Sequence, residues 1–200
     1  MTPRVATAPL HPQARIGPNS VLQLLPLLDE TLGRSERERL LRSAGMAAPP
    51  SGAGLMSEAP AASLHQRLRA EHPDIAARLT RGAGERTGEY IIQHRIPPAA
   101  LLVLRRLPAW LAGPLLGRVI EKHAWTFAGS GRFRVVSLQP AIFEIADNPV
   151  VRGETAAQPV CHWHAAVFAR LYRHIVDPGL DCRETQCCAS GAPACRFEIA

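Results

Sequence analysis

The chain has 200 residues, of which 46% are hydrophobic and 20% are charged, and its formal net charge is +6. This length and composition fit one globular domain, or a domain with an extension. Its apolar segments are all shorter than the roughly 18 residues that a bilayer-spanning helix requires, so we expect no transmembrane segment. The basic residues include no run of five or more, which argues against nucleic-acid binding.

The N-terminal part of the chain is predicted to be an extension. Residues 1–15 are rich in proline and are expected to form a flexible tail. Residues 16–60 are predicted to form a helical extension followed by a linker, because the stretch 47–60 is low in complexity. Within this extension, Ser35 and Glu38 have the spacing of a capping box, which predicts the start of a short helix.

Residues 61–200 are predicted to form the main domain, in which helical patterns give way to strand patterns. A turn bounded by glycines is expected before Tyr90. The expected helices span 61–80, 99–126 and 160–175, and the expected strands span 133–138, 142–146, 182–188 and 195–199. This order predicts an α+β fold, with N-terminal helices followed by a small antiparallel sheet that one helix crosses.

All five cysteines lie in the last forty residues, and none of the preceding 160 residues is a cysteine. The closing hairpin is expected to bring Cys187 and Cys195 together. Cys161 lies at the expected start of a helix, where backbone N–H groups favour the thiolate. Glu184 is a candidate fourth ligand, and three sulfurs with one oxygen satisfy tetrahedral zinc. With an odd number of cysteines and no apolar signal region at the N-terminus, we expect a reducing, cytoplasmic location.

The identity of the fourth ligand is open at this stage. Glu184 and Cys187 are three positions apart, so they face opposite sides of a regular strand unless a bulge or the end of the strand intervenes. The alternatives for the fourth position are Cys182, Cys188 and His162. Two other readings of the cluster are buried, inert thiols and a redox site. An iron–sulfur cluster is disfavoured, because the paired CxxC spacing is missing.

Several segments between residues 14 and 199 resemble a known family. The C-terminal segment resembles the closing motif of the 4-vinyl-reductase-like domain, which occurs in small-molecule sensor regions of bacterial activators. Together the segments are similar to the bacteriochlorophyll-biosynthesis family traditionally named bacteriochlorophyll 4-vinyl reductase. The segments that carry the resemblance are RIGPNSVLQLLPLLDETLG, HAWTFAGSGRF, FEIADNP, CHWHA and ETQCCASGAPACRFEI.

The resemblance implies a fold, a metal site and a pathway. The implied fold is the α+β ligand-binding fold of haem nitric-oxide sensors and of vesicle-tethering subunits. The implied metal is a structural zinc ion held by three cysteines and one glutamate, which match Cys161, Glu184, Cys187 and Cys195. The implied pathway is bacteriochlorophyll biosynthesis, at a chlorophyllide or protochlorophyllide precursor that carries an 8-vinyl group.

The residues favour binding of this precursor over its reduction. Hydride delivery needs a nicotinamide or flavin site, and no G-x-G-x-x-G segment follows an expected strand. The preferred hypothesis is therefore a protein that binds and delivers the tetrapyrrole. The alternative is the vinyl reductase itself, supplied with electrons from outside, and a small-molecule sensor module is the weaker alternative.

A magnesium tetrapyrrole is a flat apolar disc whose metal accepts an axial ligand. Its site needs apolar walls and a suitably placed histidine. Two short segments of the sequence concentrate such groups, HAWTF and CHWH, and their candidate ligand-binding residues are His123, Trp125, Phe127 and His164. Expected partners are the pigment precursor and enzymes of its pathway, with homodimerisation and peripheral membrane association as further options.

Overall fold

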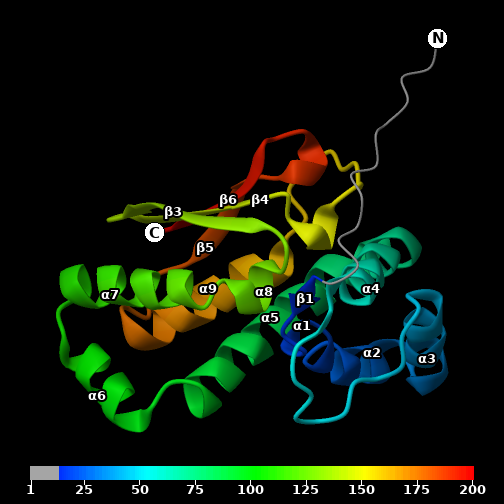
Figure 1. Cartoon of the computed structure of the whole chain (residues 1–200), viewed down its shortest axis with the longest axis horizontal. Coiled ribbons are helices and arrows are strands. Elements are labelled where there is room, and N and C mark those ends of the chain that lie inside the picture. The colour runs from blue at the N-terminus through cyan, green and yellow to red at the C-terminus, as the bar shows by residue number, and fades with distance from the viewer. Residues whose placement is uncertain (1–13) are drawn as a thin grey trace.

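The computed structural model describes residues 14–200, so most of the predicted tail lies outside the described part of the chain. Figure 1 shows the arrangement of the elements. The helices are α1 (Asn19–Leu22), α2 (Leu25–Leu32), α3 (Arg34–Ser43), α4 (Glu58–Glu71), α5 (Pro73–His94), α6 (Pro98–Arg106), α7 (Ala109–Lys122), α8 (Trp125–Ala128) and α9 (His162–Ile175). The strands are β1 (Arg15–Ile16), β2 (Met56–Ser57), β3 (Arg132–Leu138), β4 (Ala141–Ala146), β5 (Cys182–Gln186) and β6 (Ala194–Ile199).

The main sheet is antiparallel, with its strands in the order β3-β4-β6-β5. Helices α7 and α9 lie under one face of this sheet, and α5 lies beneath α9 (Figure 1). Along β4 the side chains alternate between buried and half-buried, as expected for a strand with one covered face. The prediction of an α+β fold with a small antiparallel sheet is therefore confirmed.

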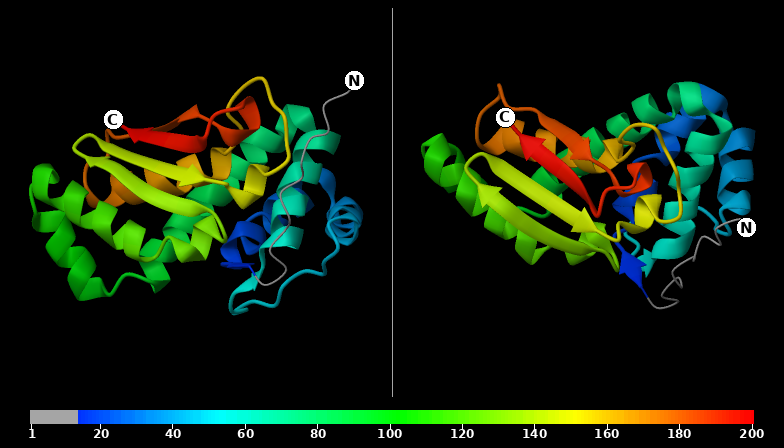
Figure 2. Two further views of the ribbon diagram at one scale, coloured as in Figure 1. Left: turned by 45° about the horizontal axis from the view of Figure 1, so that its top comes forward. Right: turned by 90° about the horizontal axis from the view of Figure 1, so that it is seen from above.

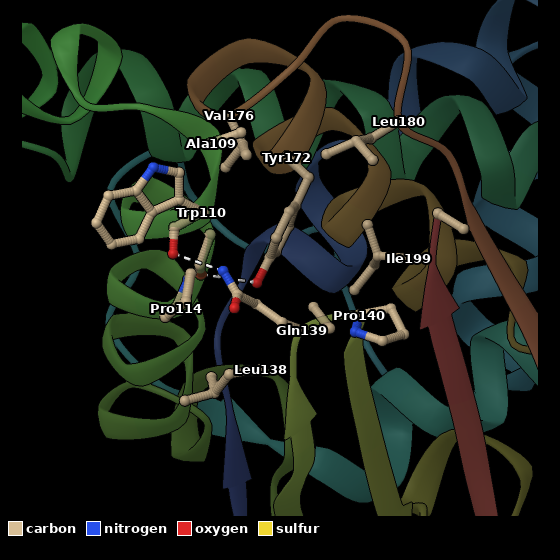
Figure 3. Close-up of a pocket in the computed structure, with 13 residues that line it drawn as sticks. Ala109, Trp110, Pro114, Leu138, Gln139, Pro140, Tyr172, Val176, Leu180 and Ile199 are labelled. Atoms are coloured by element: carbon tan, nitrogen blue, oxygen red, sulfur yellow. Dashed lines mark hydrogen bonds between the residues drawn. The ribbon is translucent and has the colours of Figure 1, made fainter.

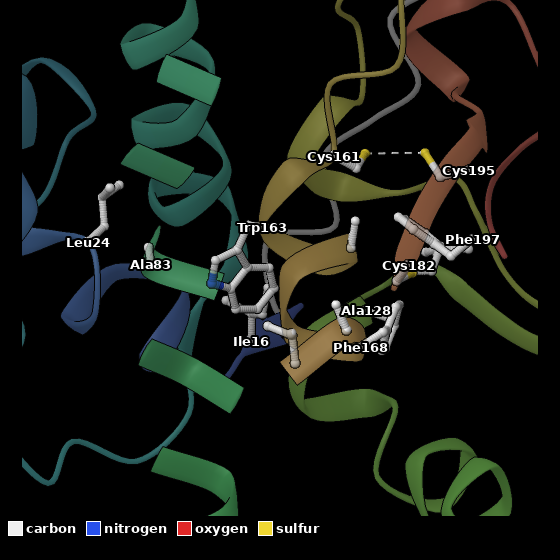
Figure 4. Packing of buried hydrophobic residues seen from close by; sticks show 14 of the residues in the cluster. Ile16, Leu24, Ala83, Ala128, Cys161, Trp163, Phe168, Cys182, Cys195 and Phe197 are labelled. Atoms are coloured by element: carbon white, nitrogen blue, oxygen red, sulfur yellow. Dashed lines mark hydrogen bonds between the residues drawn. The ribbon is translucent and has the colours of Figure 1, made fainter. Parts of the chain in front are cut away.

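Aromatic side chains fill the space between the sheet and α9. Phe143 of β4 and Phe197 of β6 are fully buried, and each packs edge-on against Phe168 of α9 at a ring-centroid distance of 5.2–5.3 Å. Phe127 of α8 and Phe133 of β3 extend this cluster, which Figure 4 shows in part. Edge-to-face contacts of this kind add to the free energy gained by burying the rings.

The glycines before Tyr90 do not form the predicted turn, because α5 continues through them without a break. They serve close packing instead. A Cβ atom on Gly84 would lie 2.7 Å from Cβ of Ala166, and one on Gly88 would lie 2.6 Å from Cβ of Arg170. Both partners belong to α9, so the glycines let the two helices approach more closely than larger residues would allow. The local sequence around these glycines does not reveal that α9 packs against them.

The predicted linker is shorter than expected. Met56 and Ser57 pair with Arg15 and Ile16 in a two-stranded sheet, and α4 begins directly afterwards at Glu58. The Glu58 carboxylate is buried and accepts hydrogen bonds from the backbone N–H and the hydroxyl of Ser130, each at 2.6 Å. These contacts fix the start of α4 against the segment that precedes β3.

Helices α1–α4 gather at one end of the molecule, and α6 and α7 lie at the other (Figure 2). The predicted capping box is wrong, because α3 begins at Arg34 with Gly33 as its N-cap, two residues earlier than a box at Ser35 requires. Glu38 accepts a hydrogen bond from the Arg34 side chain instead. Buried apolar side chains of α1–α4 belong to the same hydrophobic core as those of α5 and α9. No helix in residues 14–200 has the length and apolarity needed to cross a bilayer.

Candidate metal centre and apolar pocket

The four predicted metal ligands come together at the N-terminus of α9. One ligand atom from each of Cys161, Glu184, Cys187 and Cys195 lies within 4.8 Å of the other three. The Sγ atoms of Cys161 and Cys195 are 3.5 Å apart (Figure 4), and Sγ of Cys187 is 3.9 Å from each of them. A tetrahedral zinc ion with bonds of about 2.3 Å to sulfur requires sulfur separations of about 3.8 Å. A disulfide would require about 2.05 Å, so these sulfurs are not bonded to one another, and their spacing is compatible with that of zinc ligands.

A bulge in β5 removes the difficulty of strand parity. The register between β5 and β6 shifts between Glu184 and Gln186, so Thr185 is the extra residue. Cys187 follows the end of β5, outside the regular strand. A bulge and the end of the strand, either of which would relieve the parity conflict, are therefore both present, and Glu184 faces the three sulfurs. The alternatives for the fourth position lie outside the group of four converging residues, namely Cys182, Cys188 and His162.

The cluster concentrates acidic groups in a dry environment. Hydrogen bonds donated by the thiols of Cys161 and Cys195 lower the pKa of Cys187 far below its usual range. Burial raises the pKa of Cys161 well above its usual value, and hydrogen bonding to Cys161 and Cys187 raises that of Cys195. Burial, together with the nearby Cys187, raises the pKa of Glu184 to about 8. The four groups thus share little negative charge on their own, whereas a bound dication would stabilise all of them as anions.

The pKa of Cys161 differs from the sequence expectation. Its position at a helix N-terminus favours the thiolate, but burial of the sulfur outweighs that effect in the metal-free cluster. The thiolate is therefore expected at Cys161 only when a cation neutralises the cluster.

The surroundings of the cluster fit a zinc ion. Oε2 of Glu184 accepts a hydrogen bond from the Cys161 N–H at 2.6 Å, while its Oε1 is buried and has no partner. The side-chain amide of Asn148 donates to Sγ of Cys161, and the Cys188 N–H donates to Sγ of Cys195, each at 3.4 Å. Such donors orient thiolate ligands and stabilise their charge. These four residues would complete the coordination of a zinc ion, as in structural zinc sites.

The predicted ligand-binding residues do not converge on one cavity. His164 is buried, and its Nε2–H donates to the backbone carbonyl of Phe127 at 3.2 Å. Phe127 belongs to the aromatic cluster beneath the sheet. His123 and Trp125 lie on the surface, and Nδ1 of His123 lies 2.8 Å from the carbonyl of Val119 in its own helix. The structure therefore brings two of the four residues together and leaves the other two exposed.

An apolar pocket that the sequence did not predict lies between α7, the β3–β4 turn and the C-terminal end of α9 (Figure 3). Its volume is about 300 Å³. Trp110 stands at its rim with 65% of its surface exposed, and the side-chain amide of Gln139 donates to the Trp110 carbonyl at 2.5 Å. The hydroxyl of Tyr172 donates to the Gly113 carbonyl at 3.2 Å, so the ring presents carbon atoms to the pocket. Its walls come from four segments that are distant in the sequence, the fourth being the end of β6, and sequence periodicity does not bring them together.

Comparisons with known proteins identify the family. The chain is 53% identical over 185 residues to the bacteriochlorophyll synthase 23 kDa chain of Cereibacter sphaeroides, covering 92% of this chain and 90% of that one. It is 44% identical over 194 residues to the protein of the same name from Rhodobacter capsulatus, covering 97% of this chain and 91% of that one. The chain belongs to this family. The predicted resemblance to a bacteriochlorophyll-biosynthesis protein is thereby confirmed.

The V4R domain matches residues 141–200, the segment that runs from β4 to the end of the chain and contains all four candidate metal ligands. Solved structures share the fold at low sequence identity. An H-NOX protein from K. algicida has a TM-score of 0.58 at 12% identity, covering 92% of this chain and 95% of that chain. The phenol-responsive sensory domain of the activator PoxR has a TM-score of 0.53 at 15% identity, covering 82% of this chain and 89% of that chain. The expected likeness to nitric-oxide-sensor folds is confirmed.

Proposed function

We propose that this chain serves bacteriochlorophyll biosynthesis by binding a magnesium-tetrapyrrole precursor with an 8-vinyl group and delivering it to a pathway enzyme. The observation that carries the proposal is the half-open apolar pocket beside α7, in a chain whose curated relatives are named as chains of bacteriochlorophyll synthase. That name supports action alongside other proteins of the pathway. The structural neighbours add that this fold accommodates ligands, since the PoxR sensory domain was solved with phenol.

The size and shape of the pocket suit a carrier. A volume of about 300 Å³ is at the low end for small-molecule sites, so it encloses only one edge of a tetrapyrrole. The remainder of the disc would lie over the exposed indole of Trp110, where two flat π-systems stack. A pigment held in this way keeps one face accessible, which allows transfer to an acceptor. The closed aromatic cluster around Phe168 offers no such access.

The glycine-rich turns give little support to a nicotinamide-dependent reductase. In residues 14–200, Gly84 and Gly88 are used in helix packing. The turn at Gly129–Gly131 lies against the Glu58 carboxylate, which already accepts the Ser130 N–H and would repel a phosphate. A four-coordinate zinc ion has no accessible redox chemistry. Vinyl reduction by this chain would therefore need an external electron donor. Conversion of the divinyl pigment to the monovinyl form would support this alternative.

We assign the zinc ion a structural role at a distance from the pigment. Cys161 caps the N-terminus of α9, whereas Tyr172 near the other end of this helix lines the pocket. Cys195 begins β6, and Ile199 at the end of that strand lines the same pocket. The 14-residue helix is about 21 Å long, so the metal acts by fixing α9 against the hairpin and not by contact with the ligand.

The two exposed tryptophans allow a matched test. Trp110 is 65% exposed at the pocket, and Trp125 is 55% exposed at the site that the sequence favoured. Neither substitution to alanine removes core packing. Titration with divinyl protochlorophyllide, followed by pigment absorbance, should show about fivefold weaker binding for Trp110→Ala, since one stacking contact is worth about 1 kcal/mol. Trp125→Ala should bind like the unmodified chain.

Weaker binding by Trp125→Ala than by Trp110→Ala would place the pigment site at the residues predicted from the sequence, around Trp125 and His164. Equal affinities in both variants and the unmodified chain would remove the pocket from the proposal. No binding of either divinyl or monovinyl pigment to the unmodified chain would overturn the proposed function.

A further inference from the structure

Helix α6 is apolar, yet it has no buried residue. Six of its nine residues are alanine, leucine or valine, and each of them is exposed or half-buried. A helix this short is not stable in isolation and gains its stability from packing of an apolar face. Leu102 and Val103 instead present 53% and 60% of their surface to solvent. The unpartnered side of this helix therefore has the character of a contact surface.

The exposed apolar side chains are concentrated in one part of the molecule. Within residues 14–200, every exposed large hydrophobic residue lies between residues 102 and 136. Most of them belong to the solvent side of α6 and α7, which we call the α6–α7 face, and they are Leu102, Val103, Trp110, Leu111, Leu115 and Val119. Clustering of this kind marks an interaction surface, whereas scattered apolar residues do not.

The same segment is basic. Residues 98–122 contain four basic side chains and one acid, giving a net charge of +3, half of the chain's +6. Arg105, Arg106, Arg118 and Lys122 are all exposed. An exposed apolar side flanked by arginine and lysine is the composition of helices that lie in the headgroup region of a bilayer. It is a poor self-association surface, because two copies would bring like charges together.

A groove on α6 combines both features. It has a volume of about 360 Å³ and is lined by Pro98, Leu101, Leu102, Arg105 and Arg106. The apolar residues fit an acyl chain, and the two guanidinium groups fit a phosphate, to which arginine can donate two parallel hydrogen bonds. The groove thus suits an anionic amphiphile with its phosphate at the arginines.

We propose that the α6–α7 face binds the surface of an anionic lipid bilayer. This proposal does not depend on pigment binding, and its test uses pigment-free protein and the full chain. The probe is a set of vesicles made of phosphatidylcholine alone or of equal parts phosphatidylcholine and phosphatidylglycerol. Co-sedimentation should show binding to the mixed vesicles that weakens with added salt, and much weaker binding to neutral vesicles.

The first variant tests the charge. Arg105→Gln with Arg106→Gln should lower the partition coefficient about thirtyfold, since each basic residue near an anionic surface contributes about fivefold. The matched control is Arg78→Gln with Arg183→Gln, two exposed arginines on α5 and β5 that lie outside the α6–α7 face. This control should partition like the unmodified chain. An equal decrease in the partition coefficients of the two double variants would show that binding depends only on net charge, and would overturn the assignment to the α6–α7 face.

The second variant tests the apolar part. Val103→Glu should abolish binding, whereas Val136→Glu, at a 39% exposed position on β3, should leave it unchanged. Circular dichroism should be the same for both, because neither side chain is buried. Failure of the unmodified chain to bind mixed vesicles would overturn the proposal. A dimer in light scattering that Val103→Glu abolishes would replace the bilayer with a second copy of the chain.

Discussion

Three sulfurs and one carboxylate oxygen converge at Cys161 because a single extra residue, Thr185, is inserted in β5. The spacing of these residues indicated a metal site but left the fourth ligand open, since parity in a regular strand turns Glu184 away from Cys187. A bulge is a property of strand pairing, which depends on the partner strand β6 and is not visible in the local pattern.

Cys195→Ser is expected to remove the metal. Serine is a poor zinc ligand at neutral pH, so bound zinc should fall from about one ion per chain to nearly none, with a loss of several kcal/mol of folding free energy. Cys182→Ser is the matched control, because Cys182 is equally buried but lies outside the group of four. It should keep its zinc while being destabilised by about 1–3 kcal/mol. Equal zinc content in Cys195→Ser and the unmodified chain, measured by elemental analysis, would contradict the assignment.

Two buried histidines should make the fold sensitive to acid. Burial lowers the pKa of His164 to about 4 and that of His65 to about 3, with Arg69 adding to the effect on His65. The unfolded chain binds these protons near pH 6.5, so it holds more protons than the folded chain below that pH. Stability should be fully present above pH 6.5 and should fall by several kcal/mol between pH 6.5 and 4.

Urea unfolding across this pH range measures the effect. His65→Gln can still donate to the Ser20 carbonyl, which the His65 ring contacts at 2.8 Å, but it cannot titrate. The variant should therefore show a shallower decline with falling pH, whatever its stability at pH 7. An unchanged slope would show that His65 is not buried in its neutral form.

At the scale of elements, local patterns predicted the strands well and the helices of the N-terminal half less well. Apolar and polar residues alternate in 133–138 and 142–146, as expected for strands with one covered face, and this alternation can be read from the local sequence. The structure has β3 and β4 at these positions. The glycines of α5 were misread as a turn because their role depends on α9, about eighty residues away along the chain. The pocket beside α7 was missed for the same reason.

Gly84→Ala should destabilise the packing of α5 on α9. Its new Cβ would meet Cβ of Ala166 at 2.7 Å and also the backbone carbonyl of Trp163, so the helices must separate, at a cost of about 1–3 kcal/mol. Gly82→Ala is the control, because its Cβ would contact only the flexible end of Leu27, at 3.2 Å. There the higher helix propensity of alanine should offset the contact. Thermal unfolding distinguishes the two, and equal melting temperatures would contradict the close approach.

At the scale of the whole molecule, the candidate metal centre, the aromatic cluster and the pocket follow one another along α9. The candidate metal ligands lie at its N-terminal end, the aromatic cluster along its length, and the pocket near its C-terminal end. The N-terminal helices pack on α5 at one end of the molecule, and the α6–α7 face lies at the other (Figure 2). The predicted fold class and family follow from motifs that are contiguous in sequence, whereas this spatial order follows from tertiary packing.

The most direct test of the account is to incubate zinc-loaded protein with an excess of divinyl protochlorophyllide, with and without NADPH, and to identify the recovered pigment by chromatography. The account predicts a shifted absorbance band at one pigment per chain or fewer, and full recovery of the divinyl form under both conditions. Monovinyl pigment in excess of the protein, formed only with NADPH, would contradict the account and establish the chain as the reductase.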